Sequence, residues 1–78
     1  MSFLDLVAER YGNPRAIFAT AEKIPHGTPV KIFVENEGKI IDAISTGKKE
    51  KGCHVVTVKK NNRSWRLRMR PRNILTRW

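Results

Sequence analysis

Apolar residues and arginines alternate without a break from Trp65 to Arg70. In a β-strand successive side chains point to opposite faces, so the apolar members would face a core and the arginines would line the outside. Alternate residues of a strand lie about 6.6 Å apart, twice the rise of about 3.3 Å per residue. At this spacing the guanidinium groups of Arg66, Arg68 and Arg70 could each meet a different phosphate of a nucleic-acid strand. The pattern therefore favours a strand that binds a polyanion.

The positive charge of the chain is concentrated in its last third. The 78 residues carry a net charge of +9. Residues 1–24 are neutral and residues 25–46 carry a net charge of −1, whereas residues 47–78 hold eleven Lys or Arg against a single acid, Glu50. Like charges at this density repel each other unless a polyanion neutralises them. This distribution favours nucleic acid, or an acidic protein surface, as the partner.

Further basic and aromatic residues extend the predicted binding surface. The predicted nucleic-acid contacts are Lys48, Lys49, Lys51, Lys59, Lys60, Arg63, Arg66, Arg68, Arg70, Arg72 and Trp78. Trp78 is the predicted stacking residue, although docking of the C-terminus into the fold is an equal alternative. Trp65 is expected in the core with Leu67 and Met69. Asn61 and Asn62 could read base edges, but their role in a turn already explains them. The competing interpretation of the whole surface is an ordinary solvated sheet face, whose charges discourage aggregation.

Other classes of function find little support in the sequence. His26, His54 and Cys53 match no zinc signature, and no phosphate-binding loop is present. We therefore expect a protein without enzyme activity, metal or cofactor. A single cysteine cannot form an internal disulfide, and no signal peptide or apolar run of about eighteen residues occurs. These features predict a soluble intracellular protein, cytoplasmic or nucleoid-associated, with no membrane partner.

The chain is short enough to form one domain over residues 1–78, with a helical segment at 1–25 and an antiparallel β-barrel at 26–78. A first helix is predicted from Ser2 as N-cap to Gly12 as C-cap, with apolar residues at helical spacing. A second helix is predicted to begin at Asn13-Pro14 and to end at Pro25, with one apolar face formed by Ile17, Phe18, Ala21 and Ile24. Residues 3–24 thus also permit a helix-turn-helix reader of DNA, with 14–23 as the reading helix.

The remaining sequence predicts β-strands at 30–35, 39–45, 54–59 and 65–70, and a last strand at 76–78. The strand at 39–45 alternates less cleanly than the others, which indicates a bulge or two buried faces. Between the strands we expect a hairpin turn at 36–38, a charged loop at 48–51 bracketed by glycines, and a tight turn at 60–63. A short helical turn is expected at 71–75.

This order of elements resembles small SH3-like barrels, such as KOW, Tudor and chromo modules and the C-terminal domains of integrases. The resemblance covers Gly27 to Trp78 and rests on the order of elements and on the closing sequence Arg70-Pro71-Arg72-Asn73-Ile74-Leu75. It implies an antiparallel barrel of four to five strands, and the two short helices predicted before it complete an α+β fold. It also implies a tendency to bind nucleic acid or peptides, but it assigns no functional residue.

The sequence thus predicts a nucleic-acid-binding protein that contacts the phosphate backbone with limited sequence specificity. Duplex DNA is favoured over RNA, because a basic strand with few exposed aromatic residues suits a backbone better than splayed bases. The alternative is a protein-interaction module whose basic face docks on an acidic surface of a larger nucleic-acid-processing machine. Clustered carboxylates and phosphates attract arginine by the same electrostatics, so both partners remain open at this stage.

Overall fold

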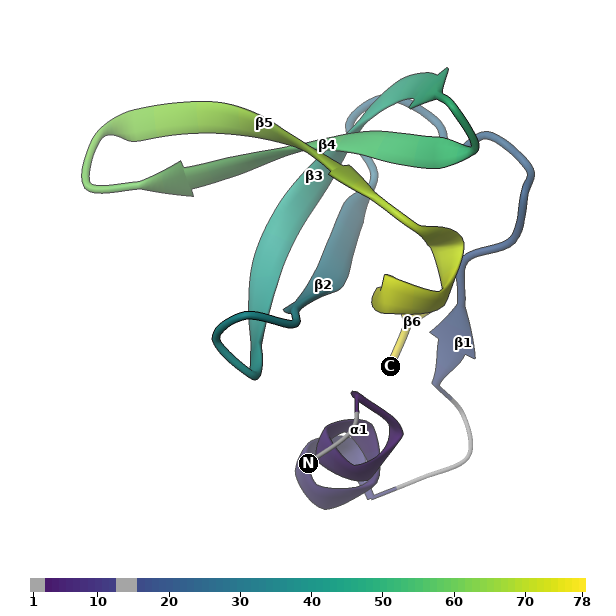
Figure 1. Cartoon of the computed structure of the whole chain (residues 1–78), viewed down its shortest axis with the longest axis vertical. Coiled ribbons are helices and arrows are strands. Elements are labelled where there is room, and N and C mark those ends of the chain that lie inside the picture. The colour runs from purple at the N-terminus through teal and green to yellow at the C-terminus, as the bar shows by residue number, and fades with distance from the viewer. Residues whose placement is uncertain (1–2, 13–15) are drawn as a thin grey trace.

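The fold combines a helix with a curved antiparallel sheet, which confirms the predicted α+β class. The computed structural model describes residues 3–12 and 16–78. In this part of the chain the elements are α1 (Phe3–Tyr11), β1 (Ile17–Phe18), β2 (Pro29–Val34), β3 (Lys39–Glu50), β4 (Cys53–Lys60), β5 (Arg63–Met69), the 3₁₀ turn η1 (Pro71–Asn73) and β6 (Ile74–Arg77). The strands form one sheet in the order β1-β6-β2-β3-β4-β5, and every neighbouring pair is antiparallel (Figure 1).

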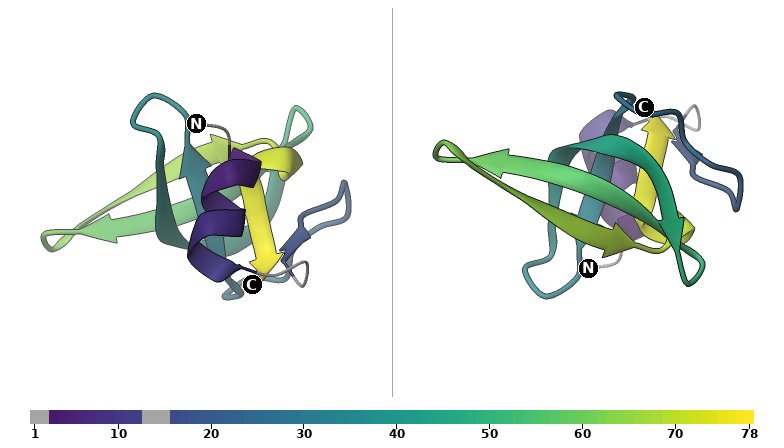
Figure 2. Two further views of the ribbon diagram at one scale, coloured as in Figure 1. Left: turned by 90° about the horizontal axis from the view of Figure 1, so that it is seen from below. Right: turned by 90° about the horizontal axis from the view of Figure 1, so that it is seen from above.

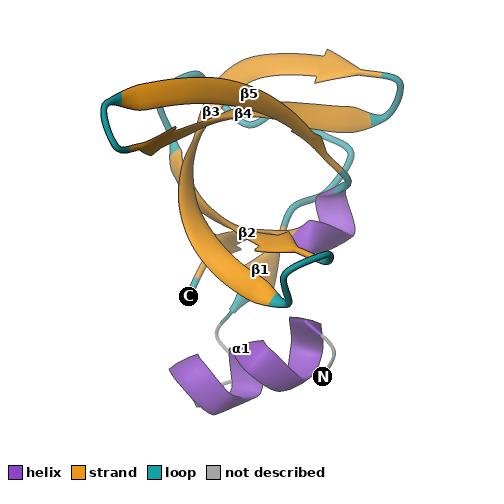
Figure 3. Cartoon of the chain, turned by 60° about the vertical axis from the view of Figure 1, so that its left-hand side comes forward, coloured by secondary structure: helices purple, strands orange, loops and turns teal. Residues whose placement is uncertain are grey.

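The sheet curls around its core but does not close into a barrel. Figure 3 shows β3 curving from its turn beside β2 up to β4 and β5, which lie on the side opposite to β1 and β2. Within residues 3–12 and 16–78, β1 and β5 lie at the two ends of the strand order and are not hydrogen-bonded to each other. The closed barrel predicted from the sequence is therefore wrong. Among the described residues, the second edge of β5 is paired with no other strand.

Strand β3 is long because a glycine bulge replaces the loop expected at 48–51. Ser45 pairs with Val56, whereas Lys48 pairs with Val55, so Thr46 and Gly47 have no partners of their own in the ladder. The bulge suggested within 39–45 is not found there, since this segment pairs regularly with β2 and the shift follows Ser45. The charged loop is also wrong, since β3 continues to Glu50. The connection to β4 is only Lys51-Gly52, both with positive φ, as a tight two-residue hairpin requires.

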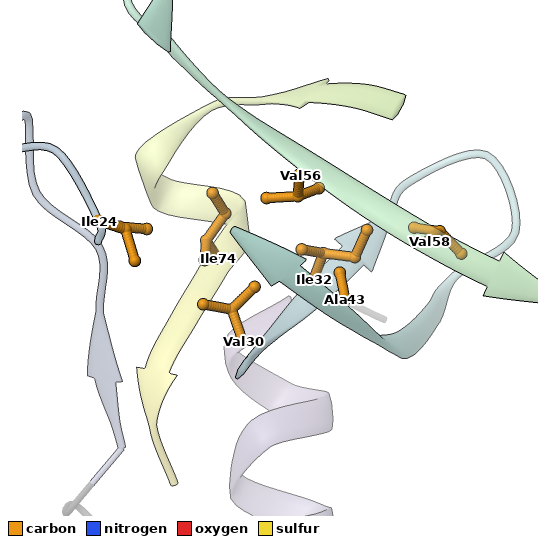
Figure 4. Packing of buried hydrophobic residues seen from close by; sticks show 7 residues of the cluster. All are labelled: Ile24, Val30, Ile32, Ala43, Val56, Val58 and Ile74. Atoms are coloured by element: carbon orange, nitrogen blue, oxygen red, sulfur yellow. The ribbon is translucent and has the colours of Figure 1, made fainter. Parts of the chain in front are cut away.

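Apolar side chains are buried on both faces of β2 and β3, as the irregular alternation of β3 also allowed. On the concave side, here called the inner face, Val56 points towards Ile74 and Ile32 (Figure 4). On the opposite, outer face, Phe3 of α1 stacks on Phe33 with ring centroids 4.9 Å apart. Helix α1 lies across β6 and β2 (Figure 2) and thus covers that part of the outer face. The outer face of β4 and β5 lies away from this helix (Figure 1).

The predicted second helix is wrong. Ile17 and Phe18 form β1 against Arg77 and Leu75 of β6, because pairing with β6 outweighs the weak helical periodicity. Residues 19–28 then run irregularly along β3 and β4 and are fixed there by side chains. The Nε2 atom of His54 lies 2.7 Å from the carbonyl oxygen of Thr20, and the Ser45 hydroxyl donates to the carbonyl of Ile24 at 2.9 Å.

The helix-turn-helix alternative lacks its reading helix, since residues 16–24 contain β1 and irregular chain. Two further predictions, the N-cap at Ser2 and the helix start at Asn13-Pro14, lie outside the described residues. The other expected elements are confirmed with small changes of boundary. The helical turn spans Pro71–Asn73, and the last strand begins at Ile74, two residues earlier than expected.

The Gly47 bulge provides a test of the fold. Gly47 has a φ of +78°, and a Cβ atom there would lie 3.1 Å from the backbone nitrogen of His26. We expect Gly47→Ala to lower the free energy of unfolding by about 1–2 kcal/mol from the left-handed backbone alone, and further through the contact with His26. Gly38→Ala is the matched control, because Gly38 has a φ of +61° and nothing within 4 Å of its position for a Cβ. Equal losses in urea denaturation would contradict a role for the His26 contact.

Candidate nucleic-acid interface

The β4–β5 hairpin turns its arginines and its apolar side chains to opposite faces. Asn61 and Asn62 form its two-residue turn with φ values of 52° and 64°, which fits the type I′ geometry that hairpins prefer. Arg66 and Arg68 are exposed, whereas Leu67 packs against the inner cluster, as does Met69. The alternation in the sequence therefore predicted the orientation of the strand correctly.

Three strands contribute to the exposed basic surface. Facing residues of antiparallel strands project from the same side of the sheet. Arg68 faces Val55, which in turn faces Lys48, and Ser64 faces Lys59. We call this surface the basic face and define it by four exposed side chains on the outer face of β3, β4 and β5: Lys48, Lys59, Arg66 and Arg68.

Two acids lie at the basic face: Asp42, which lines a groove with Lys59 and is paired with Lys31, and Glu50, which lies beside Arg68. The Oε2 atom of Glu50 lies 3.9 Å from Nη1 of Arg68, and both side chains are more than half exposed. Water screens such a pair, so it contributes at most about 1 kcal/mol, and Arg68 stays available to a polyanion. The basic face therefore keeps a positive field despite Glu50.

Arg70 and Arg72 lie beside the basic face rather than on it. Arg70 is exposed just after β5, and Arg72 is exposed in η1. Together with Arg68 they line an open groove of about 450 Å³ between the end of β5 and the β2–β3 turn. Glu35 also lines the groove and accepts a hydrogen bond of 2.8 Å from the side chain of Asn73. This acid makes the groove less favourable to a polyanion than the basic face.

The other predicted cations are dispersed. The ammonium group of Lys49 donates to the carbonyl of Ala21 and thus helps to hold the segment 19–28. Lys60 faces Arg63 at the far end of the hairpin, and Lys51 lies exposed in the β3–β4 turn. The structure therefore brings four of the predicted basic residues together on the basic face. The other predicted basic residues lie at the margins of this face or elsewhere.

The two tryptophans are both exposed. For Trp78 exposure was one of two open alternatives, and for Trp65 a place in the core was expected. Trp65 shares its face with Leu67 and faces Val58 of the inner cluster, but it lies on β5, at one end of the strand order, in the hairpin that projects beyond β2 and β3 (Figure 1). Trp65 is 42% exposed, and its predicted place in the core is therefore wrong. Trp78 is 45% exposed, and its ring centroid lies 5.2 Å from Nζ of Lys31.

A groove beside the basic face was missed by sequence reasoning. Trp78 lines an open groove of about 300 Å³ on the outer face together with Pro29, Ile44, Thr57 and Lys59. Ile44 is 42% exposed although it lies in the middle of a strand. The sequence did contain a signal for the exposure of Ile44. Residues two apart in a strand share a face, and the charged Asp42 indicates that this face is in contact with solvent.

Residues 3–12 and 16–78 contain neither a metal-binding cluster nor a membrane-spanning helix. No group of three or more His, Cys, Asp or Glu in this part of the chain is placed to hold a metal ion. No helix among the same residues has the length and apolar character needed to cross a membrane. Cys53 is half-buried and its thiol is free.

Comparisons with known proteins assign this chain to no family. No protein-family model matches this chain, and no match was found among curated proteins or solved structures. The functional argument therefore depends on the geometry described above.

The orientation of β5 can be tested by stability alone. Arg66→Ala and Arg68→Ala should each change the free energy of unfolding by less than about 0.5 kcal/mol, because both side chains lie exposed. Leu67→Ala should lower it by at least about 1 kcal/mol, because Leu67 packs against the inner cluster. Urea denaturation measures all three, and a larger loss for either arginine variant than for Leu67→Ala would contradict the observed register.

Proposed function

We propose that this protein binds nucleic acid through the basic face and contacts mainly the phosphate backbone, with limited sequence preference. One observation carries the proposal. Lys48, Lys59, Arg66 and Arg68 project from one exposed surface of three adjacent strands, and Glu50 is the only acid between Gly47 and Trp78. A fixed array of cations on a rigid sheet lets several phosphates bind without ordering a flexible loop.

The spacing of the cations supports contact with more than one phosphate. Arg66 and Arg68 lie about 6.6 Å apart along β5, and Lys48 lies two strands from Arg68, about 9.6 Å away. Phosphate contacts of this kind carry no base information, which is the reason for the limited sequence preference. They fit the backbone of duplex DNA, the target expected from the sequence, and equally that of RNA or a single strand.

The architecture supports the proposal by analogy only. The order β6-β2-β3-β4-β5, with a 3₁₀ turn before the last strand, is similar to that of small SH3-like barrels. We propose that the sheet is an open variant of this architecture, in which α1 and β1 cover one end. Such folds serve many functions, so the basic face rather than the fold carries the argument.

An acidic protein is the second candidate partner, and the free edge of β5 favours it. Edge strands accept an extended segment of another chain through backbone hydrogen bonds. The arginines of β5 would select a segment rich in Asp or Glu and would repel a second copy of the same strand. This interaction would use backbone groups that phosphate binding leaves free.

Single substitutions on β5 test the proposed function. Arg66→Ala and Arg68→Ala should lower affinity by similar factors for unrelated nucleic-acid sequences, because both lose backbone contacts. Each variant should also reduce the slope of log affinity against log salt by about 0.7–0.9, the value for one lost phosphate contact. Fluorescence anisotropy with labelled oligonucleotides measures both quantities.

Lys23→Ala is the matched control for these variants. Lys23 is equally exposed, but it lies on the segment that is fixed to β3 and β4 by Ser45 and His54. Its removal should leave affinity and salt slope unchanged within error. If Arg66→Ala and Arg68→Ala fold and bind as the unchanged protein does, the basic face is not the binding site.

Glu50 offers a test in the opposite direction. Glu50→Gln keeps the shape of the side chain but removes the negative charge beside Arg68. We expect this variant to bind a labelled oligonucleotide about two- to fivefold more tightly at low salt, since a surface pair of this kind is worth up to about 1 kcal/mol. The gain should fade as salt is raised. Unchanged or weaker binding at low salt would contradict the placement of the phosphates at Arg68.

A further inference from the structure

Two large apolar side chains lie exposed next to the basic face. Trp78 and Ile44 line an open groove of about 300 Å³, whose wall also includes Pro29, Thr57 and Lys59. Apolar side chains that gather in a groove at the margin of a charged surface mark a binding site more often than scattered ones do. The basic face alone gives no role to this groove.

The indole ring of Trp78 lies against the ammonium group of a charged pair. Lys31 forms an ion pair with Asp42, and its Nζ atom lies 5.2 Å from the centroid of the Trp78 ring. This distance is typical of a cation–π contact. A ring that is fixed before binding loses less conformational entropy when a ligand stacks on it. Asp42 also lines the groove, and its ion pair with Lys31 offsets the negative charge that it would present to an anionic ligand.

The groove and the basic face form one continuous surface. Pro29 faces Ile44, Ile44 faces Thr57, and Thr57 faces Arg66, so one row of the outer face joins the groove to the arginine strand. Three inter-strand spacings of about 4.8 Å separate Pro29 from Arg66, about 14 Å in all. Lys59 belongs to both surfaces. A strand of a few nucleotides can therefore reach both.

We propose that the preferred ligand is single-stranded nucleic acid, with one base stacked on Trp78 in the groove and adjacent phosphates bound by Lys59 and Arg66. This inference rests on the proposed function and replaces the duplex expected from the sequence. That expectation assumed few exposed aromatic residues, whereas Trp78 is exposed and lies against Lys31. In a duplex the base faces are covered by their neighbours, so only an unpaired base can stack on the indole.

The experiment compares the unchanged chain, Trp78→Ala and Trp65→Ala in anisotropy titrations. The ligands are a labelled single-stranded oligonucleotide, an abasic strand of the same length, and a duplex. Trp78→Ala should weaken binding of the single strand about 5- to 150-fold, the range for loss of one stacked base, and should change binding of the other two less than twofold. Trp65→Ala is the control, because Trp65 is similarly exposed at 42% but projects from the opposite face.

A second readout does not depend on truncating Trp78. In Trp65→Phe the indole of Trp78 is the only one in the chain, since the sequence holds two tryptophans. Its fluorescence should be quenched to saturation by the single-stranded oligonucleotide and not by the abasic strand.

The outcomes separate the two proposals. Binding of the single strand without quenching, and with no loss in Trp78→Ala, would overturn the stacking inference and leave the basic face as the site. Quenching of equal size by the duplex would overturn the preference for single strands. A change in Trp78 emission with protein concentration alone would place a second copy of the chain over the groove and overturn the inference. Absence of binding to all three ligands at low salt would overturn the proposed function itself.

Discussion

The register of the β4–β5 hairpin is the constraint on which the proposed binding surface depends. Side chains alternate across a strand, so a slip of one residue would bring Leu67 to the solvent and turn Arg66 and Arg68 towards the inner cluster. An unpaired guanidinium in that cluster would cost several kcal/mol. The two-residue turn at Asn61-Asn62 and the burial of Val56, which faces Leu67, both select the observed register. The same interactions that stabilise the core therefore place the cations on the surface.

The rest of the chain determines which part of the outer face of the sheet stays exposed to solvent. Helix α1 covers the outer face at β2 and β6 through Phe3 and Phe33, and the segment 19–28 is fixed to β3 and β4 by His54 and Ser45. The outer face of β3, β4 and β5 is left to the cations. The bulge at Gly47 adds to it, because the shifted ladder brings Lys48 into line with Val55 and Arg68. A loop at this position would have left Lys48 without a fixed place relative to the arginines.

Local patterns predicted the parts of the fold that local interactions determine. The alternation in β5, the turn at Asn61-Asn62 and the α+β class could be predicted because each depends on neighbouring residues. The second helix could not be excluded in this way, since pairing of Ile17 with Arg77 joins residues far apart in the sequence. Trp65 was misplaced for a similar reason: its exposure depends on the place of β5 at one end of the strand order, which no local pattern shows. The groove at Trp78 joins three strands and β6, so no single segment of the sequence contains its signal.

The most direct test of the central claim is the salt dependence of nucleic-acid binding by the unchanged chain, measured by fluorescence anisotropy. If the four cations of the basic face each neutralise one phosphate of a single strand, log affinity should fall with log salt with a slope of about −3. A slope of this size, with tighter binding of single strands than of duplex DNA, is the predicted result. Undetectable binding to single strands, duplex DNA and RNA at low salt would contradict the account and make an acidic protein the leading candidate partner.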